Sequence, residues 1–127
     1  MSTKLEEVLT KFQSEIPNFI STGIAEVESG LELLAISADP NFVTATAGAS
    51  FSDVVKANAK GLDLLGIGAE TTEDILITIK NGMILLRMLG ANHYHGLAMG
   101  AQTPLGFARA IMKKYETPLL DALKAIT

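Results

Sequence analysis

Apolar residues recur along this chain with two different periods, and these periods predict its helices and strands. Over residues 3–15 they follow the i, i+3, i+4, i+7 spacing of one helical face, and Ser2 or Thr3 is placed to cap that helix. Residues 20–28 and 31–37 are predicted strands, and a hairpin loop that contains Gly30 joins them.

The next predicted helix is long. We expect it to begin at Asp39-Pro40, because aspartate caps helices and proline is tolerated in a first helical turn. The apolar stripe continues to Leu65, and Gly66 is placed to end the helix.

An Asn-Gly pair, Asn81-Gly82, separates two apolar runs and predicts a hairpin. Such a pair supplies the two positive-φ residues of a type I′ turn. We therefore expect a two-residue loop in which Lys80 pairs with Met83. That register places six apolar side chains on one face: Ile75, Ile77, Ile79, Ile84, Leu86 and Met88.

The last third of the chain predicts one more strand and one more helix. A turn at residues 90–93 precedes a strand at 94–99. Thr103 is the expected cap of the final helix, Pro104 occupies its first position, and Pro118 should kink or divide it.

The order of elements is thus α-β-β-α-β-β-β-α within a single domain, residues 1–127. Five strands with helices available for both faces predict an α/β fold. We expect a three-layer sandwich around a central five-stranded, mostly antiparallel sheet.

Composition excludes several classes of function. The formal net charge is −4 and no basic block occurs, which disfavours a nucleic-acid-binding protein. The chain has no cysteine, so neither disulfides nor thiolate metal sites are expected. No secretory signal and no run of about eighteen apolar residues is present, so we expect a cytoplasmic protein without a membrane span.

The candidate chemical groups do not form a catalytic motif. His93 and His95 fall on one face of a strand, where we expect a surface role rather than metal binding. Residues 66–68, Gly-Ile-Gly, follow a helix and indicate a helix stop rather than a phosphate loop. Arg87 and Arg109 are expected in structural ion pairs, and we predict no catalytic residue, metal ion or cofactor.

The ordered set of motifs resembles the roadblock / dynein light chain family, and bacterial and archaeal members in particular. The segments that carry the resemblance are a strand with an acidic-Gly turn at 23–31, a long helix at 40–65, an apolar strand-turn-strand at 75–86 and a Leu-Gly…Arg segment at 105–109. The resemblance implies a roadblock-like, profilin-like fold and a non-enzymatic protein. It also implies a homodimer, with the third strands paired edge to edge and the second helices packed together, that regulates or scaffolds a small Ras-like GTPase.

The residues support such a dimer independently. Under the fold that the resemblance implies, strand 74–80 lies at the edge of the sheet, where an apolar strand is an aggregation hazard unless it is paired. Its only charges are Asp74 and Lys80, so antiparallel self-pairing would bring Asp74 beside Lys80 of the second chain. A stripe of small residues would let the long helices approach closely. The predicted interface is Ala45, Ala49, Ser52, Lys56, Asp74, Leu76, Thr78 and Lys80.

Two other classes of function stay open at this point. A small-ligand-sensing domain of the profilin-like, PAS-like or GAF-like type would need an enclosed pocket with converging polar groups. A dimerisation adaptor in a larger complex would bind its partner regardless of the nucleotide state of that partner.

Overall fold

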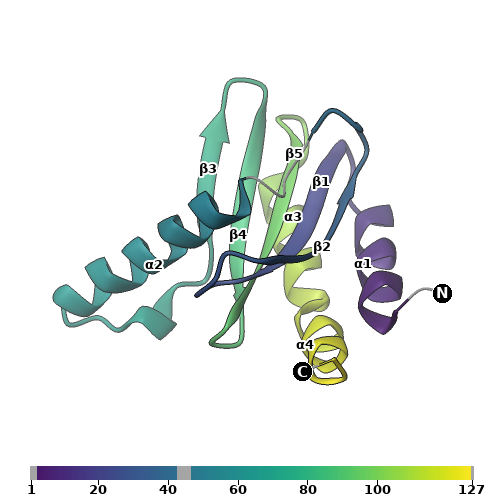
Figure 1. Cartoon of the computed structure of the whole chain (residues 1–127). Coiled ribbons are helices and arrows are strands. Elements are labelled where there is room, and N and C mark those ends of the chain that lie inside the picture. The colour runs from purple at the N-terminus through teal and green to yellow at the C-terminus, as the bar shows by residue number, and fades with distance from the viewer. Residues whose placement is uncertain (1–2, 43–46, 127) are drawn as a thin grey trace.

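The computed structural model describes residues 3–42 and 47–126, and it arranges them as helices on both faces of one sheet (Figure 1). The elements are α1 (Lys4–Ser14), β1 (Phe19–Glu26), β2 (Glu32–Ser37), α2 (Gly48–Leu64), the 3₁₀ helix η1 (Ala69–Thr71), β3 (Ile75–Ile79), β4 (Gly82–Leu89), β5 (His93–Gly100), α3 (Leu105–Lys114) and α4 (Glu116–Lys124). The predicted order of elements is confirmed, with the last helix divided in two.

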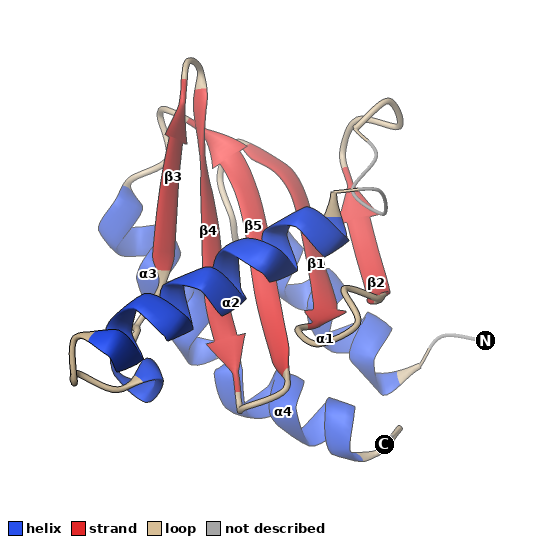
Figure 2. Cartoon of the chain, turned by 60° about the vertical axis from the view of Figure 1, so that its left-hand side comes forward, coloured by secondary structure: helices blue, strands red, loops and turns tan. Residues whose placement is uncertain are grey.

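The sheet has the strand order β2-β1-β5-β4-β3, and all neighbouring strands are antiparallel. Helix α2 crosses one face, whereas α1, α3 and α4 lie behind the other (Figure 2). The predicted three-layer α/β sandwich is therefore confirmed. Among the described residues, no helix combines the length and the apolar character that crossing a membrane requires.

The two faces of the sheet are covered unequally. The larger core lies between the sheet and the three helices α1, α3 and α4, and it buries Leu9, Phe12, Leu97 and Leu119 completely or almost so. The α2 side has a smaller core, in which Val55 of α2 packs with buried residues of the sheet. Because a single helix covers this face, several isoleucines of β3 and β4 remain only half-buried there.

The start of α2 differs from the prediction. The carboxylate of Asp39 accepts a hydrogen bond of 2.9 Å from the backbone N–H of Asn41, which forms a local turn instead of a helix cap. The helix begins at Gly48, and its N-cap, Ala47, makes no side-chain capping bond. The predicted interface residue Ala45 lies outside the described residues.

The end of α2 is as predicted. Gly66 has a φ of 74°, a conformation that residues with a Cβ atom rarely adopt. Its N–H donates to the carbonyl of Asp63, and the N–H of Ile67 donates to that of Leu62. These two bonds form a Schellman motif and satisfy the last carbonyls of the helix.

The β3–β4 turn is not the predicted one. Its loop residues are Lys80 and Asn81, and Ile79 pairs with Gly82, so the predicted pair of Lys80 with Met83 is wrong. No residue from 80 to 82 has a positive φ, which rules out a type I′ turn.

Gly82 instead belongs to strand β4, where it serves a close approach between strands. A Cβ atom at this position would lie 2.7 Å from the carbonyl oxygen of Met99 on β5. The true register is displaced from the predicted one by two residues, which preserves the side-chain alternation. The predicted apolar face is thus retained, and Ile75, Ile77 and Ile84 pack against the core on the α2 side.

The start of α3 also corrects the prediction. The hydroxyl of Thr103 is buried and donates a hydrogen bond of 2.7 Å to the carbonyl of Pro17, so it does not cap the helix. The N-cap is Pro104, and the first helical residue is Leu105. The expected interruption near Pro118 is confirmed by the separate helices α3 and α4.

Candidate interaction surface

Strand β3 lies at an edge of the sheet, as predicted. Leu76 is half-buried toward the larger core, whereas Thr78 and Ile79 are exposed, Ile79 by 50%. Strand β3 itself contains no charged residue; Glu73 and Asp74 precede it and Lys80 follows it. Nothing along the strand itself therefore discourages pairing with another strand.

Asp74 has a partner within its own chain. Arg109 of α3 donates two hydrogen bonds to its carboxylate, from Nε at 2.8 Å and from a terminal nitrogen at 3.0 Å. The hydrogen bond to Asp74 raises the pKa of Arg109, and the Asp74 side chain is only 9% exposed. The expected structural ion pair of Arg109 is therefore confirmed, and it fixes α3 to the start of β3.

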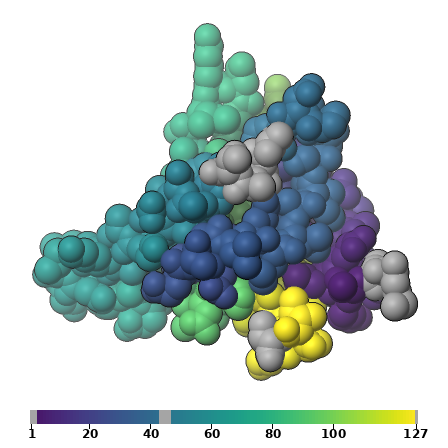
Figure 3. Space-filling view, viewed as in Figure 1, coloured from purple at the N-terminus to yellow at the C-terminus, as the bar shows by residue number. Residues whose placement is uncertain are grey.

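The C-terminal end of α2 extends past β3 and carries an apolar surface (Figure 2). Leu64 and Leu65 are 78% and 73% exposed, and Ile67 beyond the helix is 52% exposed. Figure 3 shows this end and the β3–β4 hairpin projecting from the body of the molecule. Exposed apolar residues that are contiguous mark interaction sites. One helical face cannot bury both of the consecutive apolar residues 64 and 65. This pair is the sequence pattern that identifies the exposed apolar surface.

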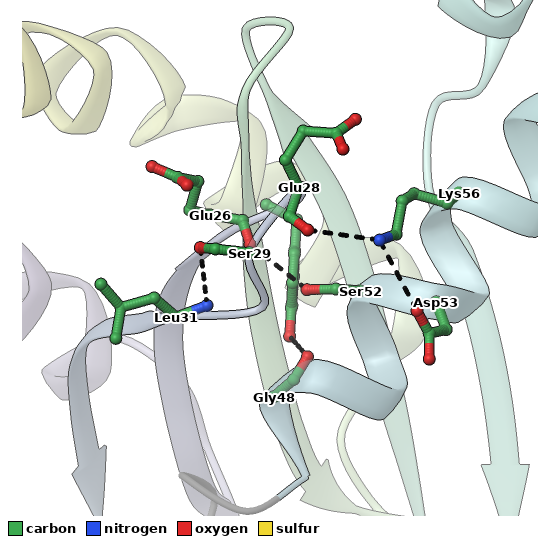
Figure 4. A network of polar contacts seen from close by, with 9 residues as sticks. Glu26, Glu28, Ser29, Leu31, Gly48, Ser52, Asp53 and Lys56 are labelled. Carbon is green, nitrogen blue, oxygen red and sulfur yellow. Dashed lines mark hydrogen bonds and ion pairs between the residues drawn. The ribbon is translucent and has the colours of Figure 1, made fainter.

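The small-residue stripe of α2 mostly faces its own chain. Ala49 is exposed, but Ser52 is 1% exposed and its hydroxyl donates to the carbonyl of Glu26 at 3.4 Å. The ammonium group of Lys56 donates to the carbonyl of Glu28 at 3.3 Å (Figure 4). Ser52 and Lys56 thus make contacts within their own chain, and their place in a helix–helix interface stays a prediction.

These contacts dock the β1–β2 turn onto the start of α2 (Figure 4). Gly30 in the turn has a φ of 73°, and a Cβ atom there would lie 2.7 Å from the Cα atom of Ala49. The Tyr94 hydroxyl donates to the carbonyl of Gly48 at 3.0 Å. Burial raises the pKa of Tyr94, and the nearby charge of Glu32 adds to that increase. The turn, the helix start and β5 therefore form one tightly packed unit.

His95 is fully buried, so the expected surface role is wrong for this residue. Its Nε2 atom lies 2.8 Å from the hydroxyl of Thr22, which itself donates to the carbonyl of Gly96 at 2.7 Å. Because that hydroxyl has one hydrogen, Nε2 must donate and Nδ1 carries no proton. The rings of His95 and Phe12 pack in an edge arrangement, with their centroids 4.5 Å apart. Burial first, and the charge of Arg87 second, lower the pKa of His95 to about 3.

Arg87 forms the expected ion pair, with Glu116 of α4 at 3.6 Å, and it also donates to the carbonyl of Glu73 at 3.3 Å. His93 is half-buried at the start of β5. In the described ranges, no group of three or more histidine, aspartate or glutamate residues is arranged to hold a metal ion.

Two hollows lie on the α2 side of the sheet. One is a cavity of about 70 Å³ over the central strands, and the other is a groove of about 1120 Å³ under the C-terminal half of α2. The groove carries charges of both signs, including Lys60, Arg87 and Glu116. Small-molecule sites usually enclose roughly 300–1,000 Å³, so the central cavity suits a single side chain rather than a free ligand.

No protein-family model matches the chain, and no curated protein matches it. Solved structures do match, and they are similar to it over nearly the whole length. Myxococcus xanthus MglB superposes with a TM-score of 0.87 at 15% identity, covering 97% of both chains. A structure of MglB with tetrameric arrangement gives a TM-score of 0.85 at 16% identity, covering 98% of this chain and 90% of the other.

A further match is the Roadblock/LC7 domain from Streptomyces avermitilis, with a TM-score of 0.73 at 8% identity. It covers 93% of this chain and 96% of the other. These likenesses define the fold class: the chain has the roadblock-type fold, as the sequence motifs predicted.

Proposed function

We propose that this chain is a homodimeric, non-enzymatic binding protein of the cytoplasm that regulates or scaffolds a small Ras-like GTPase. The observation that carries the proposal is an unblocked apolar edge strand, β3, beside the exposed apolar end of α2 on a roadblock-type fold. Self-association has a precedent in this fold, since one similar structure is described as MglB with tetrameric arrangement.

The backbone of β3 supports a specific register for the dimer. Ile79 and Gly82 flank a two-residue loop, so we expect them to form a hydrogen-bonded pair. The alternation of an antiparallel ladder then directs the backbone groups of Leu76 and Thr78 away from β4. Pairing of β3 about Ile77 would set Leu76 opposite Thr78 of the second chain, which joins the outward-directed groups.

The overhanging end of α2 supports the same arrangement. A second chain paired through β3 would extend the sheet beneath that end. Leu64, Leu65 and Ile67 would then cover the half-buried isoleucine face of the second chain, and the reverse contact would follow by two-fold symmetry. Ala49 and Val54, both exposed on α2, would lie at the helix–helix contact, whereas Ser52 would stay against its own sheet.

The GTPase partner follows from the roadblock resemblance. In this mechanism the paired sheets and helices recognise the nucleotide-dependent segments of the GTPase. Any increase in GTP hydrolysis would come from ordering the catalytic groups of the GTPase itself.

Two measurements test this proposal. Sedimentation velocity at tens of micromolar should give a dimer, and a monodisperse monomer would contradict the dimer. Affinity capture from the lysate of the source organism, run with GDP and with a non-hydrolysable GTP analogue, should recover a small GTPase. Recovery with only one nucleotide supports a regulator, equal recovery with both supports a scaffold, and recovery with neither contradicts a GTPase partner.

A further inference from the structure

The groove under the C-terminal half of α2 reaches the edge strand β3. Its lining residues include Ile75, the first residue of β3, together with Leu64 at the end of α2 and Ala69 at the start of η1. Figure 2 shows η1 below the end of α2, beside the start of β3. Leu64 is 78% exposed, and the lining residues Glu70 and Glu73 are exposed as well. This end of the groove is therefore open to solvent.

Two carboxylates border the open end of the groove. Glu70 belongs to η1, and Glu73 precedes β3. In the described ranges, no ion pair or hydrogen bond engages the carboxylate of Glu70. The hydrogen bond to Asp74 raises the pKa of Arg109 most, and the charge of Glu73 adds to that increase. Arg109 nevertheless gives its hydrogen bonds to Asp74, so Glu73 keeps an exposed carboxylate.

The positive charges of the groove are mostly engaged. Of the three described cations that line it, Arg87 and Lys56 are held in ion pairs. The third is Lys60, on α2. The carboxylates of Glu70 and Glu73 therefore outnumber the remaining cation, and the open end favours a cationic group.

The tip of the β3–β4 hairpin carries the complementary groups. Ile79 is 50% exposed, and Lys80, in the loop that follows it, is exposed too. Among the residues that the structure describes, none forms an ion pair or hydrogen bond with the side chain of Lys80. Figure 3 shows the hairpin projecting from the body of the molecule. The tip thus offers an apolar side chain and a cation that its own chain does not cover.

The register of the proposed dimer brings the tip and the groove together. Pairing of β3 about Ile77 sets Ile79 of the second chain directly opposite Ile75. Residues opposite each other on antiparallel strands point to the same face, with Cβ atoms roughly 4.5–5.5 Å apart. Because Ile75 packs with the core on the α2 side, Ile79 of the second chain would lie at the open end of the groove.

Lys80 of the second chain would follow at the point where η1 leads into β3. Asp74 stands opposite it in this register, but Arg109 already binds that carboxylate, and the Asp74 side chain is only 9% exposed. The exposed carboxylates of Glu70 and Glu73 are the ones that remain for the ammonium group.

We propose that the open end of this groove receives the β3–β4 hairpin tip of a second copy of this chain. Ile79 of the second copy packs beside Ile75, under the end of α2, and the ammonium group of Lys80 pairs with Glu70 and Glu73. Two-fold symmetry forms the contact twice. The inference rests on the proposed homodimer, and it adds the contact that selects a second copy of this chain as the partner of β3.

This contact also fixes the register of the dimer. The outward-directed backbone groups of β3 would still meet if the two strands were displaced by two residues. Such a displacement would move Ile79 of the second chain away from Ile75, and Lys80 away from the two carboxylates. Side chains at the tip therefore decide among registers that the backbone alone allows.

A charge exchange tests the polar part of the contact. K80E sets like charges together at both sites of the dimer, so its Kd should rise about tenfold at low ionic strength. K11E is the matched control, because it reverses an exposed lysine of α1 on the other face of the sheet. Sedimentation velocity measures both, and circular dichroism confirms that each variant folds.

Mixing two variants should restore the dimer. The second variant combines E70K with E73Q, where glutamine avoids placing a cation beside Arg109. Each variant alone sets like charges together, whereas a mixed dimer has one reversed pair and one native pair. With one variant ¹⁵N-labelled, native mass spectrometry of an equal mixture should find about nine-tenths of the dimers mixed, against the half expected without preference.

Two isoleucines test the apolar part. I79S should raise the Kd of the dimer about tenfold, because Ile79 loses its cover on the second chain. I126S is the matched control, since Ile126 is 52% exposed but follows α4 on the other face of the sheet. We expect I126S to leave the Kd unchanged.

The inference is overturned if K80E and I79S dimerise as the unmodified protein does, or if mixed dimers form only half of the mixture. A dimer with that behaviour contradicts this contact and leaves the proposed homodimer standing, whereas a monomeric unmodified protein contradicts both. If the E70K and E73Q variant keeps its dimer but no longer captures a GTPase, the groove belongs to the GTPase, and the inference is likewise overturned.

Discussion

Replacing Gly30 with alanine should destabilise the protein by about 2–5 kcal/mol. The left-handed φ of 73° costs a residue with a Cβ atom roughly 1–2 kcal/mol. The new Cβ would lie 2.7 Å from Ala49 Cα and 3.0 Å from Ala49 Cβ, so the start of α2 must move. Overpacking of this kind costs about 1–3 kcal/mol more.

Urea unfolding followed by far-UV circular dichroism measures this change, and G61A is the matched control. Gly61 lies inside α2 with open space around it, so G61A should stabilise the protein by about 1 kcal/mol. G30N separates the two costs, because asparagine tolerates the left-handed region but brings the same Cβ contact. A G30A variant within about 0.5 kcal/mol of the unmodified protein would refute the tight docking of the β1–β2 turn on α2.

Three further predictions concern the dimer and the core. T78P removes a backbone donor from the free edge of β3, so sedimentation velocity should show a shift to monomer while circular dichroism stays unchanged; an intact dimer would refute the register. L64D should weaken the dimer in the same assay without lowering the stability of the monomer, because Leu64 is 78% exposed in the chain. An unchanged dimer would exclude a contact between the end of α2 and the second chain. Since the pKa of His95 is lowered to about 3, the unfolded chain binds a proton at this residue that the folded chain does not bind. The free energy of unfolding therefore decreases as the pH falls below 6.5. Chemical unfolding should show a loss of about 2 kcal/mol between pH 6.5 and about pH 4.5, and H95L should lack this part of the slope.

Patterns within one element were sufficient for the order of elements, and the position of β3 at the edge of the sheet was expected from the family resemblance that this order suggested. The face of the β3–β4 hairpin followed from the two-residue alternation, although the loop itself was misplaced. The predicted face was correct despite the wrong loop, because a displacement of two residues leaves every side chain on the same face. The stop at Gly66 was predicted correctly for a similar reason, since a left-handed helix end is a local requirement for glycine.

Predictions failed where a residue's role depends on a distant part of the chain. Thr103 has a good capping side chain, but its hydroxyl bonds to Pro17 across the fold. His95 was expected at the surface, but strand pairing and α1 enclose it in the core.

The sequence by itself determined the order of the helices and strands, because that order depends on local periodicity and on glycine and proline placement. The edge position of β3 was expected from the resemblance to the roadblock family, and the few charges of that strand are given directly by the sequence. Only the tertiary structure decided which surfaces stay exposed. Burial of Ser52, pairing of Asp74 with Arg109, the overhang of Leu64 and the cavity over the central strands all arise from contacts between segments far apart in the chain. Burial depends on how elements pack together, so the sequence of one element does not specify which other element will cover that element.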